Sequence, residues 1–481
     1  MNSKARIARN AFYLSLSDVG MRLISTLVTI LVARYLGPEE FGVLAVALAF
    51  SGVASYFTDL GVTHVMVREG TKPGAEMGRL LSGALRLRLT MALFTTLGVV
   101  ILVPLIYPSP LLWQAVLLVT LPTLWAGVFR GIGASYFWIS QEMEYVALIN
   151  TVAVLTQAGV LLLGVLLGWQ IVSLALAYGL SACMGALVGI FLLRRRIWFS
   201  GGRYPELLQG LWAFTAAGIF ALLLPQLGPL TLPRTADLEE TGFFGVGYRF
   251  PGVLYTLPSV IARAFYPQLF YHGQRDLAAH RRLAEKELRV LGVLGFLLAI
   301  PFSLYAKWII RVLFGPAWVE GGGRVLAILA WLVAFQALST SLGDYLTTQG
   351  LQSRRTGVLG FVTVLGVVLY LLGGKWAGAV GAAWAAFTVE ALLMVGCLLA
   401  SPGFEEMAVR SLFPVLGVGL GATGVAFLIY RFVSSGFLGL VLSFLGSLLF
   451  VLAVDGEIRE HFLWLAQTGW KKAKASFLSR A

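Results

Sequence analysis

The hydrophobic pattern of the chain is a series of apolar runs separated by short polar connections. Each run holds about 20 mostly apolar residues, the length that an α-helix needs to cross the hydrocarbon core of a bilayer. About fourteen runs fit this description, and the pattern therefore predicts an all-α polytopic membrane protein. The expected spans are 10–33, 41–60, 80–106, 111–138, 145–168, 170–193, 207–233, 242–270, 288–311, 323–348, 356–374, 377–400, 409–432 and 436–454.

Positive charge is distributed unevenly over the connections between these runs. Lys and Arg cluster at 194–203, 281–289 and 354–355, whereas the alternate connections are short and several carry no charge. Cytoplasmic loops of membrane proteins are enriched in Lys and Arg. An even number of spans puts both termini on one side, so we expect a multi-pass protein of the cytoplasmic (inner) membrane with both termini in the cytoplasm.

Composition supports a lipid-facing surface. Hydrophobic residues make up 58% of the 481 residues and charged residues 12%, whereas a soluble domain has about 25% charged residues. The net charge of +13 is spread over loops, which excludes a single patch for nucleic acid. The four histidines lie near or beyond helix ends, and we interpret each as solvated surface: His64, His272, His280 and His461.

A repeat relates two parts of the chain. Residues 34–53 align with 234–253 at a shift of 200, and Glu40/Glu240 and Gly42/Gly242 are among the coincidences. In both copies the segment joins the first two helices of a six-helix set. We therefore expect two lobes in the same orientation, which would place a substrate site between them. The predicted domains are 1–200, 205–402, a helix pair at 403–454 and a cytoplasmic amphipathic tail at 455–481.

Two stretches are amphipathic and are not expected to span. One is 274–288, and the other is the tail after Asp455. A basic face beside apolar residues suits the inner-leaflet interface, where anionic lipid attracts Lys and Arg. A solvated helix packed on the loops is the alternative for both.

Ionisable residues within the spans mark a candidate cavity. Such residues are costly in lipid and usually face a bundle interior or water. In the first span Asp18, Arg22 and Ser25 lie on one helical face, because residues three or four apart share a face. We expect the spans 10–33, 41–60, 207–233 and 242–270 to line the cavity. The candidate residues are Asp18, Arg22, Ser25, Asp59, Arg130, Arg249, Arg263, Asp344 and Glu390.

The depth of two arginines within their spans suggests which kind of ligand the cavity binds. Arg22 and Arg249 lie deep in their spans, and a guanidinium stays charged and binds phosphate bidentately. An anionic headgroup is therefore the expected ligand. The alternative for Asp18 and Arg22 is that they only neutralise each other, one turn apart. For residues near helix ends, namely Asp59, Arg263 and Asp344, snorkelling to the interface is the alternative.

Three prolines fall within one expected span: Pro225, Pro229 and Pro233. Each removes a helix hydrogen bond and favours a kink. We expect this span to bend as the lobes move, with a static kink as the alternative.

Enzymatic motifs are missing from the sequence. There is no GxxxxGK[ST] loop, no HExxH pair and no nucleophile with a histidine inside the expected spans. We therefore expect a transporter that is not an enzyme and that needs no cofactor or metal. Its energy would come from a coupling ion, H⁺ or Na⁺, or from the membrane potential.

Three segments carry a resemblance to a known family: ARYLGPEEFG at 33–42, DLG at 59–61 with VRE at 67–69, and GYRFPGVLYTLP at 247–258. They resemble the polysaccharide-export (Wzx-type) flippases of the MOP superfamily, which also includes the MATE exporters and lipid II flippases. The resemblance implies two lobes around a cationic cavity. It also implies alternating access that moves an undecaprenyl-pyrophosphate-linked oligosaccharide for surface polysaccharide or O-antigen, with the lipid tail in a lipid-facing groove.

The same resemblance bears on single residues. Arg249 stands where related lipid-linked-precursor flippases place an arginine. Late in the first span this chain has Val28 and Thr29, where lipid II flippases have an Arg-Asp pair, which disfavours a peptidoglycan precursor.

Other functions compete with this expectation. A cation-coupled multidrug exporter of the same superfamily would need an acidic, aromatic pocket, and deep acids are fewer than deep arginines. A lipid II flippase is a second alternative, and a membrane scaffold in a polysaccharide assembly complex is a third. The expected partners are a polyprenyl-pyrophosphate-linked oligosaccharide, membrane lipids and a polysaccharide polymerase or ligase.

Overall fold

The computed structural model describes the backbone of residues 3–460 except 108, 195, 197–199, 201–206, 208–210 and 435. Within this range, the side chains of 3–19, 22, 211–214, 216 and 217 are outside the described part. The tail expected after Asp455 lies outside it from residue 461 onward. All regular structure in the described residues is helical, which confirms the all-α class.

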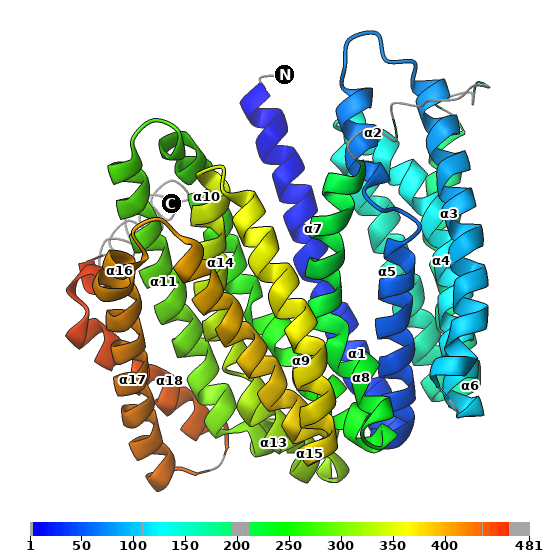
Figure 1. Cartoon of the computed structure of the whole chain (residues 1–481). Coiled ribbons are helices and arrows are strands. Elements are labelled where there is room, and N and C mark those ends of the chain that lie inside the picture. The colour runs from blue at the N-terminus through cyan, green and yellow to red at the C-terminus, as the bar shows by residue number, and fades with distance from the viewer. Residues whose placement is uncertain are drawn as a thin grey trace, which may run out of the picture. The chain divides into compact units, whose positions relative to one another are not determined.

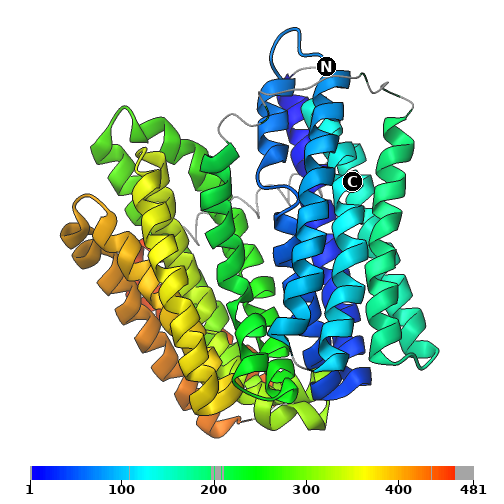
Figure 2. The same ribbon diagram turned by 45° about the vertical axis from the view of Figure 1, so that its right-hand side comes forward.

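The chain divides into two compact units. Unit 1 comprises Met1–Val246, Leu313–Gly321 and Thr363–Ala382. Its helices run side by side in Figures 1 and 2, where α4 packs against α1, α3, α5 and α6. The helices that begin in its first segment are α1 (Ser3–Tyr56), α2 (Val62–Gly70), α3 (Met77–Ile106), α4 (Pro110–Ile139), α5 (Met143–Leu166), α6 (Ile171–Leu193), α7 (Leu211–Leu223), α8 (Leu227–Thr231) and α9 (Leu238–Leu254).

Unit 2 comprises Gly247–Val312, Gly322–Val362 and Ala383–Ala481. In it α11 packs against α10, α14, α17 and α18. The remaining helices are α10 (Thr256–Gly273), α11 (Leu277–Leu304), α12 (Ala306–Phe314), α13 (Val319–Leu329), α14 (Leu332–Thr348), α15 (Gln352–Ala400), α16 (Phe404–Met407), α17 (Phe413–Phe432) and α18 (Phe437–Val454). The six-helix lobes stay a prediction from the repeat, since packing joins α7, α8 and the start of α9 to the N-terminal helices.

Helix length and composition agree with a membrane protein. Among the described residues, ten helices are long and apolar enough to cross a bilayer. Backbone at Gly37 in α1, and at Ala377 and Gly378 in α15, is not helical, so each of these long elements consists of two helical segments. Many large apolar side chains are exposed, including Phe94 and Leu105 on α3, as expected where lipid is the solvent. The number fourteen itself stays a prediction.

The aligned repeat segments contact each other in a self-complementary way. A methyl group on Gly42 would overlap the carbonyl oxygen of Leu238, and one on Gly242 would overlap that of Pro38. Leu238 and Pro38 are themselves related by the shift of 200. Two surfaces that contact each other reciprocally in this way are related by a local two-fold axis. The pattern supports the duplication and explains why Gly stands at both positions.

The chain turns just before Gly42 and just before Gly242. Each of these turns is held by a hydrogen bond to a segment of the same unit that is distant in the sequence. The Tyr35 hydroxyl donates to the carbonyl of Trp169, in the turn between α5 and α6. The Glu240 carboxylate accepts from the backbone N–H of Ala379, at the break in α15, at 2.6 Å. Gly378 beside it has φ 55°, a left-handed conformation that glycine adopts without strain. The motif ARYLGPEEFG thus forms the turn before Gly42 and the close contact between the helical segments that contain Gly42 and Gly242.

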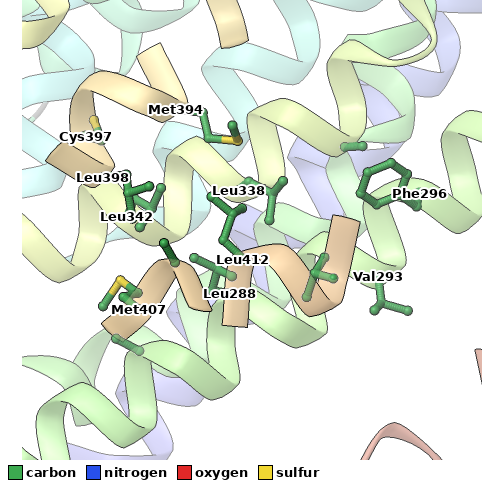
Figure 3. Packing of buried hydrophobic residues seen from close by; sticks show 14 of the residues in the cluster. Leu288, Val293, Phe296, Leu338, Leu342, Met394, Cys397, Leu398, Met407 and Leu412 are labelled. Atoms are coloured by element: carbon green, nitrogen blue, oxygen red, sulfur yellow. The ribbon is translucent and has the colours of Figure 1, made fainter. Parts of the chain in front are cut away.

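A large cluster of buried hydrophobic residues lies in unit 2 (Figure 3). Leu288, Val293 and Phe296 of α11 pack with Leu338 and Leu342 of α14. Met394, Cys397 and Leu398 of α15 and Met407 and Leu412 close the same core. This core holds α11 and α14 in fixed register, which sets the positions of the polar side chains between them.

One expected boundary is wrong. The stretch 274–288 was expected to lie at the interface as a separate amphipathic segment. In the structure α11 runs without interruption from Leu277 to Leu304, and Ala284 and Leu288 are buried in the core. The apolar side of the basic stretch therefore continues directly into the spanning helix.

Candidate functional site

Arg130 places a guanidinium inside the helix bundle of unit 1. It lies about two and a half turns from the end of α4 and is partly buried. Its stem packs on α6, where a methyl group on Gly185 would lie 3.3 Å from Cδ. The Tyr178 phenol is within electrostatic reach. No carboxylate of the described residues pairs with Arg130, so its charge is available to an anion.

Asp59 is part of a polar corner between α1 and α2. Its Oδ1 accepts from the Thr63 hydroxyl at 2.8 Å and from the Thr63 backbone N–H at 3.2 Å. The Arg88 guanidinium, 2% exposed, donates to the same oxygen and lies 2.6 Å from the Thr63 hydroxyl. Gly61 has φ 88°, which permits the tight turn that brings these groups together. Asp59 therefore has an ion-pair partner, Arg88, that the sequence analysis did not identify.

The VRE segment contributes a second polar contact at this corner. Glu69 is 3% exposed and accepts hydrogen bonds from Lys72 and Arg68. The hydrogen bond from Lys72 and the one from Arg68 hold the pKa of the Glu69 carboxyl below its usual range, against the effect of burial.

Glu69→Gln is expected to lower the thermal stability at neutral pH and to lose this effect in acid. A lowered folded-state pKa means that the carboxylate stabilises the fold above the unfolded-state value of about 4.3. That stabilisation disappears as the pH falls through the lower folded-state value. Melting temperatures of wild type and variant in detergent should therefore converge below about pH 4. A gap that stays constant with pH would contradict the ionic role, and Glu405→Gln, at an exposed carboxylate, is the control.

Unit 2 brings three carboxylates to one helix. Around α14, Asp344 pairs with Arg355 at 3.7 Å, and Glu390 accepts from the Ser339 hydroxyl at 2.5 Å. Glu287 of α11 accepts from the Ser341 hydroxyl at 3.2 Å and is fully buried. Asp344 and Glu390 were predicted site residues, whereas Glu287 lay within the stretch taken for an interfacial segment.

The other predicted residues are more dispersed. Arg249 lies on α9 and is partly buried, whereas Arg263 on α10 and Ser25 on α1 are exposed. The backbone of α1 is helical at Asp18 and Arg22, but both side chains lie outside the described part. The shared cavity therefore stays a prediction.

The three prolines interrupt the helix that contains them. Two short 3-10 turns, Leu224–Gln226 and Leu232–Arg234, replace α-helix at Pro225 and Pro233, and Pro229 lies in α8 between them. The missing N–H of each proline explains the interruption. A moving hinge here stays a prediction.

The interpretation of His280 as solvated surface is wrong. His280 is fully buried on α11. Its Nε2 lies 2.7 Å from the Thr348 hydroxyl, and its ring stacks on Tyr345 with centroids 4.9 Å apart. Position near a helix end suggested exposure, but the core of unit 2 extends to the first turn of α11.

An apolar pocket of about 470 Å³ opens in unit 2. Its wall combines residues of α11, α13, α14, α15 and α17. The Trp331 indole, which donates to the Ser303 hydroxyl at 3.0 Å, also lines the pocket. The principal lining residues are Phe296, Trp331, Phe335, Trp384, Phe387 and Leu420. Such a surface accommodates a hydrocarbon chain and excludes a sugar.

Solved structures share this helical architecture. A lipid II flippase MurJ in an inward closed conformation matches with a TM-score of 0.71 at 14% identity, over 93% of this chain and 99% of that one. An inward-facing multidrug resistance MATE transporter of the MOP superfamily matches with a TM-score of 0.67 at 14% identity, over 81% and 94%. The MATE transporter DinF-BH in complex with R6G matches with a TM-score of 0.57 at 15% identity, over 82% and 94%. A comparison with curated proteins finds no match.

The helices long and apolar enough to cross a bilayer identify a multi-pass membrane protein. Its fold is that of the MOP-superfamily transporters. The sequence also matches a family described as polysaccharide biosynthesis protein, over residues 31–321. This match covers more than half of the chain, and the protein belongs to that polysaccharide biosynthesis family. The recognition made from the three sequence segments is confirmed at this level.

Proposed function

We propose that the protein is a secondary transporter, not an enzyme, that flips a polyprenyl-pyrophosphate-linked oligosaccharide across the cytoplasmic membrane by alternating access. The cargo would serve the assembly of surface polysaccharide or O-antigen. The observation that carries the proposal is the family match over 31–321, on a chain whose fold is shared with a lipid II flippase.

Two local features support this cargo. Arg130 offers a partly buried guanidinium to a pyrophosphate, since arginine binds phosphate oxygens bidentately and remains charged. The aromatic-lined pocket of unit 2 suits part of an isoprenoid tail. In unit 2 the candidate for contact with the pyrophosphate is Arg249, because of its position in the segment GYRFPGVLYTLP.

Arg130→Gln and Arg249→Gln are each expected to slow flipping by about tenfold or more. A charge-assisted hydrogen bond contributes about 1.5–3 kcal/mol, and 1.4 kcal/mol is a factor of ten. The measurement is leaflet equilibration of a fluorescent polyprenyl-pyrophosphate oligosaccharide in liposomes. Arg282→Gln, at an exposed arginine at the start of α11, is the control and should equilibrate the cargo like wild type. Wild-type rates in both Arg130 and Arg249 variants would exclude them as headgroup contacts.

A cation-coupled multidrug exporter is the second candidate. It is favoured by Glu287, Asp344 and Glu390 in unit 2, together with the aromatic pocket. Uptake of a cationic dye into the same liposomes separates the two functions. Dye transport without flipping would replace the first proposal by the second.

A further inference from the structure

Another cavity in unit 2, of about 650 Å³, opens between α11, α17 and α18. It is separate from the aromatic-lined pocket described above, to which α18 does not contribute. Its lining combines three charged side chains, Arg289, Asp455 and Glu457, with an apolar wall on α17 and α18. A cavity that has both characters fits an amphipathic ligand.

The cavity lies where three membrane-spanning segments begin or end. α17 begins at Phe413, α18 ends at Val454, and the expected span of α11 begins at residue 288. Hydrocarbon gives way to lipid headgroups at the ends of spans. On α17 and α18 the lining continues to Val418 and Phe450, about 6 Å deeper into the spans. The charged side chains thus lie at the level of the headgroups, and the apolar wall lies at the level of the acyl chains.

Charges of both signs meet at the mouth of this cavity. The Arg289 guanidinium donates to Glu457, and its Nε lies 3.3 Å from Oδ2 of Asp455. The Asp455 side chain is 6% exposed and its other oxygen caps the helical turn that follows, whereas the Glu457 side chain is 67% exposed. A methyl group on Gly456 would lie 3.9 Å from Nη2 of the exposed Arg459. Among the described residues, the mouth therefore combines two guanidinium groups with two carboxylates.

This mixture of charges is complementary to a zwitterionic headgroup. A guanidinium has five N–H groups and binds phosphate oxygens well. Nε of Arg289 is buried and has no hydrogen-bond partner within the described part of the chain. The exposed carboxylate of Glu457 is accessible to an ammonium group. An anionic headgroup would instead bring its negative charge beside two carboxylates, without a positive group to pair with them.

Gly417 leaves room for a hydrocarbon chain along the apolar wall. A methyl group at Gly417 would meet no atom of the described residues within 4 Å. A methyl group at Gly421, one turn further along α17, would overlap the ring of Phe450. The open space therefore closes one turn beyond the mouth, and it suits the first few carbons of an acyl chain.

We propose that this cavity binds a resident phospholipid with a primary ammonium headgroup, of the phosphatidylethanolamine type. Its phosphate contacts Arg289 and Arg459, its ammonium group donates to Glu457, and the start of one acyl chain lies against α17 and α18 beside Gly417. The lipid connects the end of α18 to α11. It is distinct from the transported lipid, so the proposal does not depend on the proposed function.

The headgroup is tested by native mass spectrometry of the purified protein with added phosphatidylethanolamine or phosphatidylcholine of identical acyl chains. Methyl groups replace the ammonium N–H donors in phosphatidylcholine, so wild type should bind phosphatidylethanolamine about threefold more tightly. Glu457→Gln should make the two affinities equal, whereas Glu460→Gln, at an exposed carboxylate three residues away, should keep the difference. Equal affinities in wild type, or tighter binding of phosphatidylglycerol, would overturn the proposal.

The location is tested by filling the cavity. Gly417→Leu should weaken the binding of phosphatidylethanolamine about tenfold or more, because the bound lipid would then be overpacked. Gly424→Leu is the matched control, since a methyl group there also meets no atom of the described residues within 4 Å and the position lies outside the cavity. Equal binding by the two variants would show that the lipid binds elsewhere.

Competition separates the resident lipid from the cargo. An excess of polyprenyl-pyrophosphate-linked oligosaccharide should leave phosphatidylethanolamine bound to wild type. Displacement would make the cavity part of the cargo path and overturn the proposal of a resident lipid. Binding of phosphatidylethanolamine by a protein that does not flip the cargo would refute the proposed function and leave this site standing.

Discussion

Alanine at Gly42 or Gly242 is expected to lower the free energy of unfolding by about 3 kcal/mol, because overpacking costs about 1–3 kcal/mol and here both neighbours are backbone. The added methyl group would overlap the carbonyl of Leu238 in one case and of Pro38 in the other. A backbone carbonyl in a helix has no rotamer through which to yield. The two helices therefore have to move apart, and a thermal shift in detergent measures the loss.

The repeat supplies the matched controls. Gly52 and Gly252 are also related by the shift of 200, and a methyl group at either would meet no atom within 4 Å. Gly52→Ala and Gly252→Ala should be neutral or stabilise by up to about 1 kcal/mol, since Ala favours helix over Gly. Equal losses at all four positions would refute the close crossing. A loss at Gly42 alone would refute its two-fold character.

Asp59→Ala is expected to cost about 4 kcal/mol, in the range for breaking a buried ion pair. It leaves the Arg88 guanidinium buried, at 2% exposed, without a carboxylate. Arg88→Met should cost only about 2 kcal/mol, because the Asp59 side chain is 33% exposed and keeps its bonds from Thr63. The order of the two losses, read from melting temperatures, is the expected result.

The double variant checks the coupling. If the two side chains form one pair, Asp59→Ala with Arg88→Met should cost less than the two single changes added together, since neither partner is left alone. Arg282→Met, at an exposed arginine near the start of α11, gives the reference for losing a surface charge. Additive losses, or a larger cost for Arg88→Met than for Asp59→Ala, would contradict the account.

Sequence reasoning succeeded where one local pattern decides the structure. Apolar runs of transmembrane length predicted the helices, and proline chemistry predicted the interruption between Leu224 and Arg234. The repeat placed Gly42 and Gly242 at equivalent positions, and the structure brings them together. The family followed from the segments 33–42, 59–61 with 67–69, and 247–258.

The ion pairs and hydrogen bonds between side chains of different helices could not be predicted from the sequence. They depend on the rotation of each helix about its axis and on its register against its neighbours. Arg88 stands 29 residues after Asp59, and no spacing rule indicates that α3 turns it toward the corner. Glu287 and His280 occur in a stretch rich in Arg and Lys, where charge suggested the lipid interface. Only the core packing of Ala284 and Leu288 shows that this face of α11 is buried. Serine partners such as Ser341 carry no sequence signal at all.

The cargo is tested most directly by comparing two lipids in liposomes that contain the purified protein. One carries the oligosaccharide on polyprenyl pyrophosphate, and the other carries the same oligosaccharide on an uncharged polyprenol. The account predicts rapid leaflet equilibration of the pyrophosphate lipid in wild type, at least about tenfold slower equilibration of the uncharged one, and none of either in empty liposomes. Equal rates for the two lipids, or rates no faster than in empty liposomes, would contradict it.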